Sequence, residues 1–427
     1  MTSVCGLDFG TSNSTVGFHD GSQVRLLDLE DQKATLPSVI FFNADLDEIS
    51  YGRAALGAYL DGYEGRLMRS MKSLLGTSLI EGHTEVQGRR LAYKQLLSQY
   101  IAELKQRAEL AAQSRFECAV FGRPVFFIDD NPAADKKAEQ TLREIAIDAG
   151  FKEIAFQYEP IAAALDYESR IEQEELVLVV DIGGGTADFS VIRLSPERRN
   201  KIERQSDILS NTGVHIGGTD FDKYLSLQQL MPLLGMGGRL SNGIEMPSAN
   251  YFNLATWHTI NLVYSQKVVR EIQDISRDIN DPNLRYRCAC FLQLIEQRDG
   301  HWLALKAEEA KIRLSDAEMV QISLERLCSK DDRSQQHVLS MDRAQLDAAI
   351  APLFAQLNKT IVDAISHAGI DGSQITTVFF TGGASGIRGL RQDIKTLLPN
   401  AKMVQGDVFG SIGAGLAWDA KRRFNEI

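Results

Sequence analysis

The chain has 427 residues, of which 44% are hydrophobic and 24% charged, as in ordinary globular proteins. This length exceeds what one hydrophobic core normally supports, so it predicts about two domains. The formal net charge of -11 argues against nucleic acid or an anionic membrane surface as a partner, and no apolar run is long enough to span a bilayer. Because residues 1–8 contain no basic leader, we expect a cytoplasmic protein with reduced cysteines.

Two segments of the chain share one pattern of strand, Asp, tight glycine-rich turn and strand. The first runs from Asp8 to Ser14, and the second runs from Asp181 to Asp188. They lie about one domain apart, which predicts a duplicated unit with a ligand between the two hairpins.

Alternating strand and helix patterns connect and follow these hairpins, as in an α/β protein. Pro160 suits the first turn of one predicted helix, and Gly150 ends another. In chain order the pattern predicts a helix over 93–112, a strand over 119–128, a helix over 133–149, a strand over 154–158, a helix over 161–170, a strand over 377–381 and a helix over 387–397.

The region between these elements in the second half is less regular. Residues 231–243 contain four glycines and are predicted to form a loop. Apolar residues then recur at helical spacing from Trp257 to Ile279, which predicts a helix that faces the core or a partner.

Short Gly/Thr turns can aim several backbone N–H groups at one phosphate. The carboxylates beside the turns, Asp8, Asp181 and Asp188, would repel a phosphate alone but suit a hydrated Mg²⁺ that bridges protein and phosphates. One such turn is weak evidence, whereas two indicate a Mg-nucleotide site. The sequence contains neither a P-loop nor a dinucleotide-binding glycine motif.

The chain resembles the ATPase domain of DnaK-type heat-shock chaperones, within the actin-like ATPase superfamily. The resemblance covers nearly the whole chain and rests on eight segments in the family's order. These are residues 6–14, 36–38, 72–76, 158–164, 181–188, 215–222, 308–311 and 381–383.

This resemblance implies a two-lobed actin-like α/β fold with duplicated mixed β-sheet units, flanking helices and a nucleotide cleft. Lobe I would comprise residues 1–175 plus 405–427, and lobe II residues 176–404. The stretch from Leu225 to Ala307 is longer than in the family, so lobe II is predicted to carry an insertion at about 225–307.

The resemblance also implies a set of site residues for ATP or ADP with Mg²⁺. Lys72 would contact the γ-phosphate and the attacking water, and Glu159 would orient that water; Asp8, Asp181 and Thr186 complete the catalytic set. Asp8, Asp181 and Asp188 would hold Mg²⁺, mostly through water. Glu308, Lys311 and Gly383 would face adenosine, within a nucleotide-binding set of Gly10, Thr11, Ser12, Asn13, Gly183, Gly184, Gly185, Thr186, Gly217, Gly218, Glu308, Lys311, Gly382, Gly383 and Asp407.

Departures from the family pattern concern the adenine side and the C-terminus. Ile312 replaces the adenine-stacking arginine, and residues 384–386 lack the usual serine and arginine, which predicts altered affinity for the base. The sequence stops at Ile427, where the chaperones continue into a client-binding domain. It therefore resembles a short, YegD-type branch.

The predicted function is Mg-ATP binding with slow hydrolysis that opens and closes the lobes, in a chaperone-like protein with an unknown protein partner or client. One alternative is a nucleotide-sensing partner or scaffold protein with little turnover, docking through residues 225–307, or a filament former. Another is a small-molecule kinase on the same fold.

Overall fold

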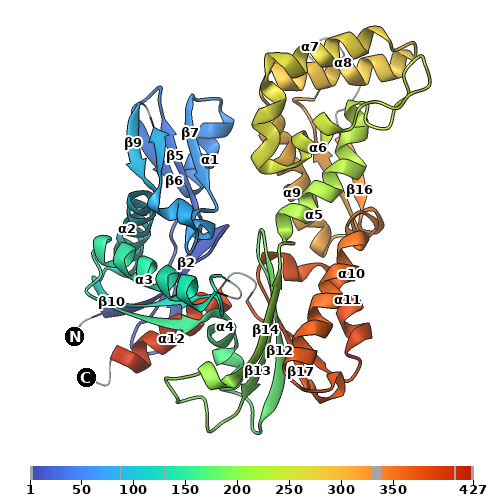
Figure 1. Cartoon of the computed structure of the whole chain (residues 1–427). Coiled ribbons are helices and arrows are strands. Elements are labelled where there is room, and N and C mark those ends of the chain that lie inside the picture. Colours follow the sequence, from blue (N-terminus) through green and yellow to red (C-terminus); the bar gives the residue numbers. More distant parts are fainter. Residues whose placement is uncertain (1–2, 87, 129–130, 328–337, 408–409, 425–427) are drawn as a thin grey trace. The chain divides into compact units, whose positions relative to one another are not determined.

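A computed structural model describes the whole chain except residues 1–2, 87, 129–130, 328–337, 408–409 and 425–427. It divides into two compact units (Figure 1). Unit 1 comprises Met1–His215, Asn358–Gly386 and Asp393–Ile427, and unit 2 comprises Ile216–Leu357 and Ile387–Gln392. Unit 1 thus contains residues of both predicted lobes, and the lobe boundaries at residues 176 and 405 stay a prediction.

The first sheet of unit 1 carries the first hairpin at its centre. Its strand order is β11-β10-β1-β2-β3, with β1 parallel to β10 and antiparallel to β2, and β4 pairs with β2. The strands are β1 (Ser3–Phe9), β2 (Asn13–His19), β3 (Val24–Leu26), β4 (Thr35–Pro37), β10 (Phe116–Arg123) and β11 (Glu153–Tyr158).

The second sheet of unit 1 repeats this arrangement. Its order is β14-β13-β12-β17-β18, with β12 parallel to β17 and antiparallel to β13. The strands are β12 (Glu175–Ile182), β13 (Ala187–Leu194), β14 (Ile208–Val214), β17 (Thr377–Thr381) and β18 (Lys402–Gln405). Each sheet therefore has a three-stranded antiparallel meander extended by two parallel strands, and the predicted duplication is confirmed.

Helices pack on both sheets of unit 1 and bury the predicted apolar stripes (Figure 1). In α2 (Tyr93–Ala112), Leu97, Tyr100 and Leu104 are fully buried. They join side chains of β1, β10 and α3 (Pro132–Asp148) in one core. In the second sheet, α4 (Glu159–Glu168) packs its apolar residues against β12 and β17. The helix and strand predictions for this unit are confirmed to within a few residues, except that the strand predicted over 119–128 runs from Phe116 to Arg123 and stops before Pro124.

Smaller elements complete unit 1. A three-stranded sheet has the order β6-β5-β7, and β8 pairs with β9. Helix α12 contacts β1 and α4. The elements are β5 (Val39–Asn43), β6 (Glu48–Tyr51), α1 (Gly52–Leu60), β7 (Gly65–Arg69), η1 (Met71–Leu74), η2 (Ser78–Glu81), β8 (His83–Val86), β9 (Arg89–Ala92), η3 (Gln205–Asp207), η7 (Gly372–Gln374), η8 (Gly383–Gly386) and α12 (Ser411–Phe424).

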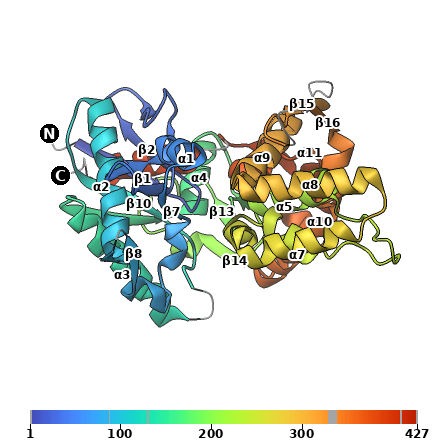
Figure 2. The same cartoon turned by 90° about the horizontal axis from the view of Figure 1, so that it is seen from above.

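Unit 2 is mainly helical, with one β-hairpin. Helices α7 and α8 lie side by side in both views (Figures 1 and 2). Helices α10 (Arg343–His367) and α11 (Arg388–Leu397) contain residues of both units. The other elements are α5 (Gly218–Leu225), η4 (Ser226–Leu230), η5 (Met231–Leu234), α6 (Ala249–Ala255), η6 (Trp257–Tyr264), α7 (Gln266–Arg277), α8 (Pro282–Glu296), α9 (Gly300–Asp316), β15 (Met319–Ser323) and β16 (Val338–Asp342).

The predicted helix from Trp257 to Ile279 is wrong in its continuity. The chain turns at Ser265, whose backbone is extended and whose hydroxyl accepts a hydrogen bond from the N–H of Val268 at 3.4 Å, so that α7 starts anew. The interpretation of the apolar stripe as core holds for Ile260, Ile272 and Ile279, which are buried.

The cysteines differ in state. Cys5, Cys118 and Cys288 are free and buried, as expected. Cys290 is disulfide-bonded, so the expectation of reduced thiols throughout is wrong for this residue. Among the described helices, we find none with the length and hydropathy needed to cross a membrane.

Candidate functional site

The first hairpin turn is held in place by a buried serine. Asp8 and Phe9 end β1, opposite Thr15 and Ser14 of β2. The Ser38 hydroxyl donates to the carbonyl oxygen of Gly10 at 2.7 Å, and the Ser38 N–H donates to that of Ser12 at 2.8 Å. Ser38 is 1% exposed. It therefore fixes the backbone on both sides of Thr11 and determines where the turn's N–H groups point.

The second hairpin turn is closed by its own backbone. Asp181 and Asp188 face each other across β12 and β13. The N–H of Gly183 donates to the carbonyl oxygen of Thr186 at 2.9 Å. The Thr186 hydroxyl donates to Asp188 Oδ2 at 3.3 Å. Gly183, Gly184 and Gly185 therefore span a tight loop with a carboxylate at each end.

The two turns approach each other closely within unit 1. A side chain on Gly184 would place its Cβ 1.9 Å from Oγ of Ser12, which is less than any non-bonded contact allows. Any larger residue there would displace the Ser12 hydroxyl. The duplicated hairpins thus bring the two glycine turns to one place, and the binding of phosphate by their N–H groups stays a prediction.

Lys72 and Glu159 meet beside the turns. Met71 and Leu75 are buried in the core of the first sheet, and the short helix η1 between them presents Lys72 on its other side. Glu159 is the first residue of α4, where the helix dipole favours a negative charge. Lys72 Nζ donates to Glu159 Oε1 at 2.7 Å, with side-chain exposures of 11% and 13%.

The site concentrates negative charge away from water. Burial and the neighbouring Glu159 raise the pKa of Asp8 to about 7. Burial, followed by Asp188, Glu159 and Asp8, raises the pKa of Asp181 well above its usual value. Burial alone would lower the pKa of Lys72, but the carboxylates of Glu159 and Asp8 raise it. Three carboxylates, those of Glu159, Asp8 and Asp181, act on one ammonium, so the site suits an additional cation.

These residues fit a Mg-nucleotide in chemistry and shape. The two glycine turns lie so close together that mainly their backbone atoms can face a bound phosphate. Burial disfavours the negative charge of Asp8 and Asp181, so a bound cation would stabilise these two carboxylates. Within the described residues, no three acidic, histidine or cysteine side chains are grouped as direct metal ligands. A hydrated ion, held through water by Asp8, Asp181 and Asp188, remains the form of binding that we predict.

Three further predicted residues, Gly382, Gly383 and Asp407, lie in unit 1. Gly382 has φ of 81°, and a Cβ there would lie 2.4 Å from Asp181 Oδ1, so this glycine packs directly on the site; Gly383 begins η8. Asp407 Oδ1 accepts from the N–H of Gly410 at 3.1 Å, and its carbonyl accepts from the Ser411 hydroxyl at 2.7 Å. Asp407 thus caps the start of α12.

The remaining predicted residues belong to unit 2. The Lys311 ammonium lies 2.7 Å from Asp222 Oδ1 and donates to the carbonyl oxygen of Gly218 at 3.0 Å. The N–H of Gly217 donates to Asp220 Oδ2 at 2.9 Å in a capping box. Lys311 of α9 thus pairs with residues of α5, and Glu308 lies one turn earlier on α9. Their proposed contacts with adenosine or phosphate stay predictions.

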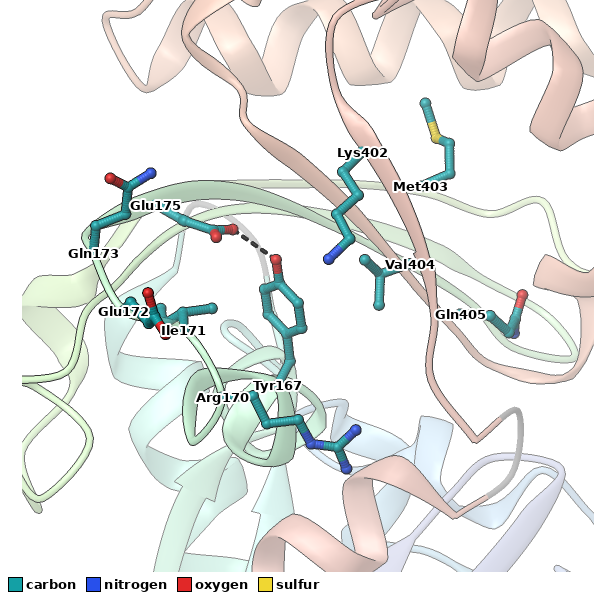
Figure 3. Close-up of a pocket in the computed structure, with 10 residues that line it drawn as sticks. All are labelled: Tyr167, Arg170, Ile171, Glu172, Gln173, Glu175, Lys402, Met403, Val404 and Gln405. Carbon is teal, nitrogen blue, oxygen red and sulfur yellow. Dashed lines mark hydrogen bonds between the residues drawn. The ribbon is translucent and has the colours of Figure 1, made fainter.

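A hollow of about 870 Å³ lies elsewhere in unit 1 (Figure 3). The Tyr167 hydroxyl donates to Glu175 Oε2 at 2.7 Å, and the Lys402 ammonium lies 5.6 Å from the centre of the Tyr167 ring. Its other lining residues come from 170–173 and β18. None of the predicted site residues lines this hollow.

The sequence interpretation assigned no role to Ser38, Ser190 or Asn211. Ser38 falls in one of the segments on which the family resemblance rests, and that was the available signal. Ser190 and Asn211 are brought together by the register of β13 and β14, and no local pattern in the sequence marks such a pair.

Comparisons with known proteins agree with the fold. The family model described as Hsp70 protein matches residues 78–230 and 296–417. The Chaperone protein DnaK of Ureaplasma urealyticum serovar 10 is 25% identical over 421 residues, which is 97% of this chain and 58% of that protein. The Chaperone protein DnaK of Mycoplasmopsis synoviae (strain 53) is 27% identical over the same shares. This chain thus spans less than two thirds of the length of these relatives.

Proposed function

The chain belongs to the Hsp70 protein family, and from this premise and the site of unit 1 we propose that it binds Mg-ATP and hydrolyses it slowly. The observation that carries the proposal is the Lys72 to Glu159 contact of 2.7 Å beside two touching glycine turns. An ammonium and an oriented carboxylate beside a phosphate nest are what phosphoryl transfer requires.

The residues of the candidate site would have separate roles in nucleotide binding and in hydrolysis. The N–H groups of residues 10–13 and 183–186, with the hydroxyls of Thr11, Ser12 and Thr186, would bind the phosphates. Asp8, Asp181 and Asp188 would order the water shell of Mg²⁺, which when bound supplies positive charge to the phosphates. Glu308, Lys311 and Gly383 would face adenosine.

Lys72 and Glu159 would position the reactants. The ammonium of Lys72 would stabilise charge on the γ-phosphate, and Glu159 would accept a hydrogen bond from the attacking water. Because Lys72 Nζ already holds Glu159 Oε1, the direction of the carboxylate is set before the substrate arrives.

Phosphate release from Mg-ATP tests this assignment. We expect Lys72→Ala and Glu159→Gln each to lower kcat by about 100-fold or more while ATP binding persists. Lys137→Ala, on an exposed lysine of α3, is the matched control and should leave kcat unchanged. Unchanged turnover in both site variants, or no turnover in the wild-type protein, would contradict the catalytic proposal.

We further propose that ATP closes the predicted lobes and that hydrolysis reopens them, so that a protein partner or client senses the nucleotide. Small-angle scattering should then give a smaller radius of gyration for Glu159→Gln with Mg-ATP than with Mg-ADP. Equal radii would argue against this motion.

A second candidate function is nucleotide sensing with little turnover. The observation that motivates it is the altered adenine side, where Ile312 stands in place of the family's stacking arginine. Tight ATP binding without phosphate release, together with loss of partner capture when residues 225–307 are deleted, would support this function. Measurable turnover would exclude it.

A further inference from the structure

A small cavity with both polar and apolar lining residues lies behind the carboxylates of the candidate site. Its volume is about 20 Å³, and its wall includes Glu159, Asp181 and Asp188 together with Ser190 and Asn211. All five residues belong to unit 1. A cavity needs roughly 10–15 Å³ and two to four polar partners to hold a water molecule, and this cavity meets both conditions.

The strand register explains why these side chains share one wall. Ser190 of β13 stands opposite Val179 of β12 on one side and Asn211 of β14 on the other. Asp181 and Asp188 form the next same-face row, two residues along. The second sheet therefore supplies one wall of the cavity, and the loop residues Pro124 and Val125 and the first residues of α4 complete it.

The hydrogen-bond chemistry of the wall requires a donor. The Ser190 hydroxyl donates its only hydrogen to Asn211 Oδ1 at 2.6 Å, so its oxygen can only accept a hydrogen bond from the cavity. The second oxygen of the Glu159 carboxylate, whose first oxygen is bound to Lys72, also accepts. Water satisfies both, because it donates two hydrogen bonds and can accept one from the Asn211 amide. The described acidic residues do not form a direct metal-binding group, which favours water over a metal ion.

We propose that this cavity binds one water molecule, which Ser190 and Asn211 hold against the carboxylates of Glu159 and Asp181. Ser190 and Asn211 are then positioning residues for the proposed hydrolysis, and in this respect the inference rests on the proposed function. Glu159 Oε1 is bound to Lys72, and the water fixes the direction of the other carboxylate oxygen. This holds Glu159 from two sides.

Ser190→Ala tests the positioning role, with Ser210→Ala as the matched control. Ser210 lies on the neighbouring strand β14, is also buried, and donates its hydroxyl to the carbonyl oxygen of Ala364 at 2.6 Å, but it does not line the cavity. We expect Ser190→Ala to lower kcat for phosphate release about tenfold, with the Kd for Mg-ATP within about twofold. Ser210→Ala should change neither by more than about twofold. An unchanged kcat in Ser190→Ala, or an equal loss in both variants, overturns the positioning role.

A crystal structure of the wild-type protein tests the water site independently of turnover. The expected result is one solvent peak within hydrogen-bond distance of Ser190 Oγ and of a carboxylate oxygen. Absence of a peak from the wild-type cavity overturns the water site. If the wild-type protein shows no turnover, the proposed hydrolysis fails, and this crystal structure still decides whether the water site exists.

Discussion

At the scale of single residues, the phosphate side of the site depends on a few buried polar groups. Ser38 contacts the first turn through its hydroxyl and its N–H, and its hydroxyl also lies 3.0 Å from that of Ser14. Removal of the hydroxyl would leave the Gly10 carbonyl without this donor. We infer that Ser38 keeps the turn shaped for phosphate.

We expect Ser38→Ala to weaken Mg-ATP binding about fivefold and to lower the free energy of unfolding by about 1–2 kcal/mol, the usual loss for a buried hydrogen bond. Calorimetric titration and urea unfolding measure these two quantities. Ser169→Ala removes an exposed hydroxyl that donates to the carbonyl of Asp166, and it should change neither. If both variants bind ATP like the wild type, Ser38 does not shape the site.

Asp8 gives the ligand-free protein a pH dependence with a defined sign. Its pKa is about 7 when folded, against about 3.9 for an ordinary aspartate, so the folded state holds the proton more tightly. Its contribution to stability is complete below about pH 4 and is lost as the pH rises through about 7.

Without nucleotide or Mg²⁺, we therefore expect the free energy of unfolding to fall between about pH 4 and pH 7. Asp8→Asn cannot ionise, so it should flatten part of this decline; Asp181 contributes in the same direction. Urea unfolding at several pH values measures the slope. Identical slopes in the wild type and Asp8→Asn would contradict the raised pKa.

Residue type alone could not predict every buried charge. Arg204 would be expected at the surface, yet it is buried, and its guanidinium donates to both oxygens of Glu168 at 2.7 and 2.8 Å and also to Asp207. Asp207 lies three residues after Arg204, but Glu168 lies far from it in the sequence, so only the folded chain brings Arg204 and Glu168 together. The pairing of Lys72 with Glu159 was predictable as a shared role through the family resemblance, but its distance was not.

At the scale of elements, α12 crosses α4 at unusually short range. A Cβ on Gly415 would lie 1.9 Å from the carbonyl oxygen of Ala162, so the two helices meet backbone to backbone. Glu159 begins α4, and the position of this helix therefore affects the site. The crossing sets that position.

We expect Gly415→Ala to lower the free energy of unfolding by about 1–3 kcal/mol, because overpacking forces the helices apart. Gly57→Ala is the matched control, since Gly57 also lies in a helix but a Cβ there meets nothing within 4 Å. It should be neutral or stabilising by up to about 1 kcal/mol. Urea unfolding compares the two, and equal effects would show that the crossing tolerates a methyl group.

The elements themselves were well predicted where periodicity was strong. The helix over 93–112 and the strand over 377–381 have the predicted bounds, because each buries one clear apolar pattern. The break at Ser265 was missed, since an apolar stripe continues in register across it while a serine cap restarts the helix. Local capping outweighed periodicity there.

At the scale of the whole molecule, the duplication is the feature that organises unit 1. Two glycine hairpins in the sequence predicted two similar sheets, and the strand orders agree. The division into compact units could not be predicted in the same way, because it does not follow chain order, and α10 and α11 each contribute residues to both units.

Isothermal titration of ATP into the wild-type protein, with and without Mg²⁺, tests the central claim most directly. We predict saturable binding of one ATP per chain with Mg²⁺, weakened about tenfold or more when the metal is chelated, because the buried carboxylates then lack their counter-charge. Absence of binding, or binding that is equally tight without Mg²⁺, would contradict a Mg-nucleotide site at the paired glycine hairpins.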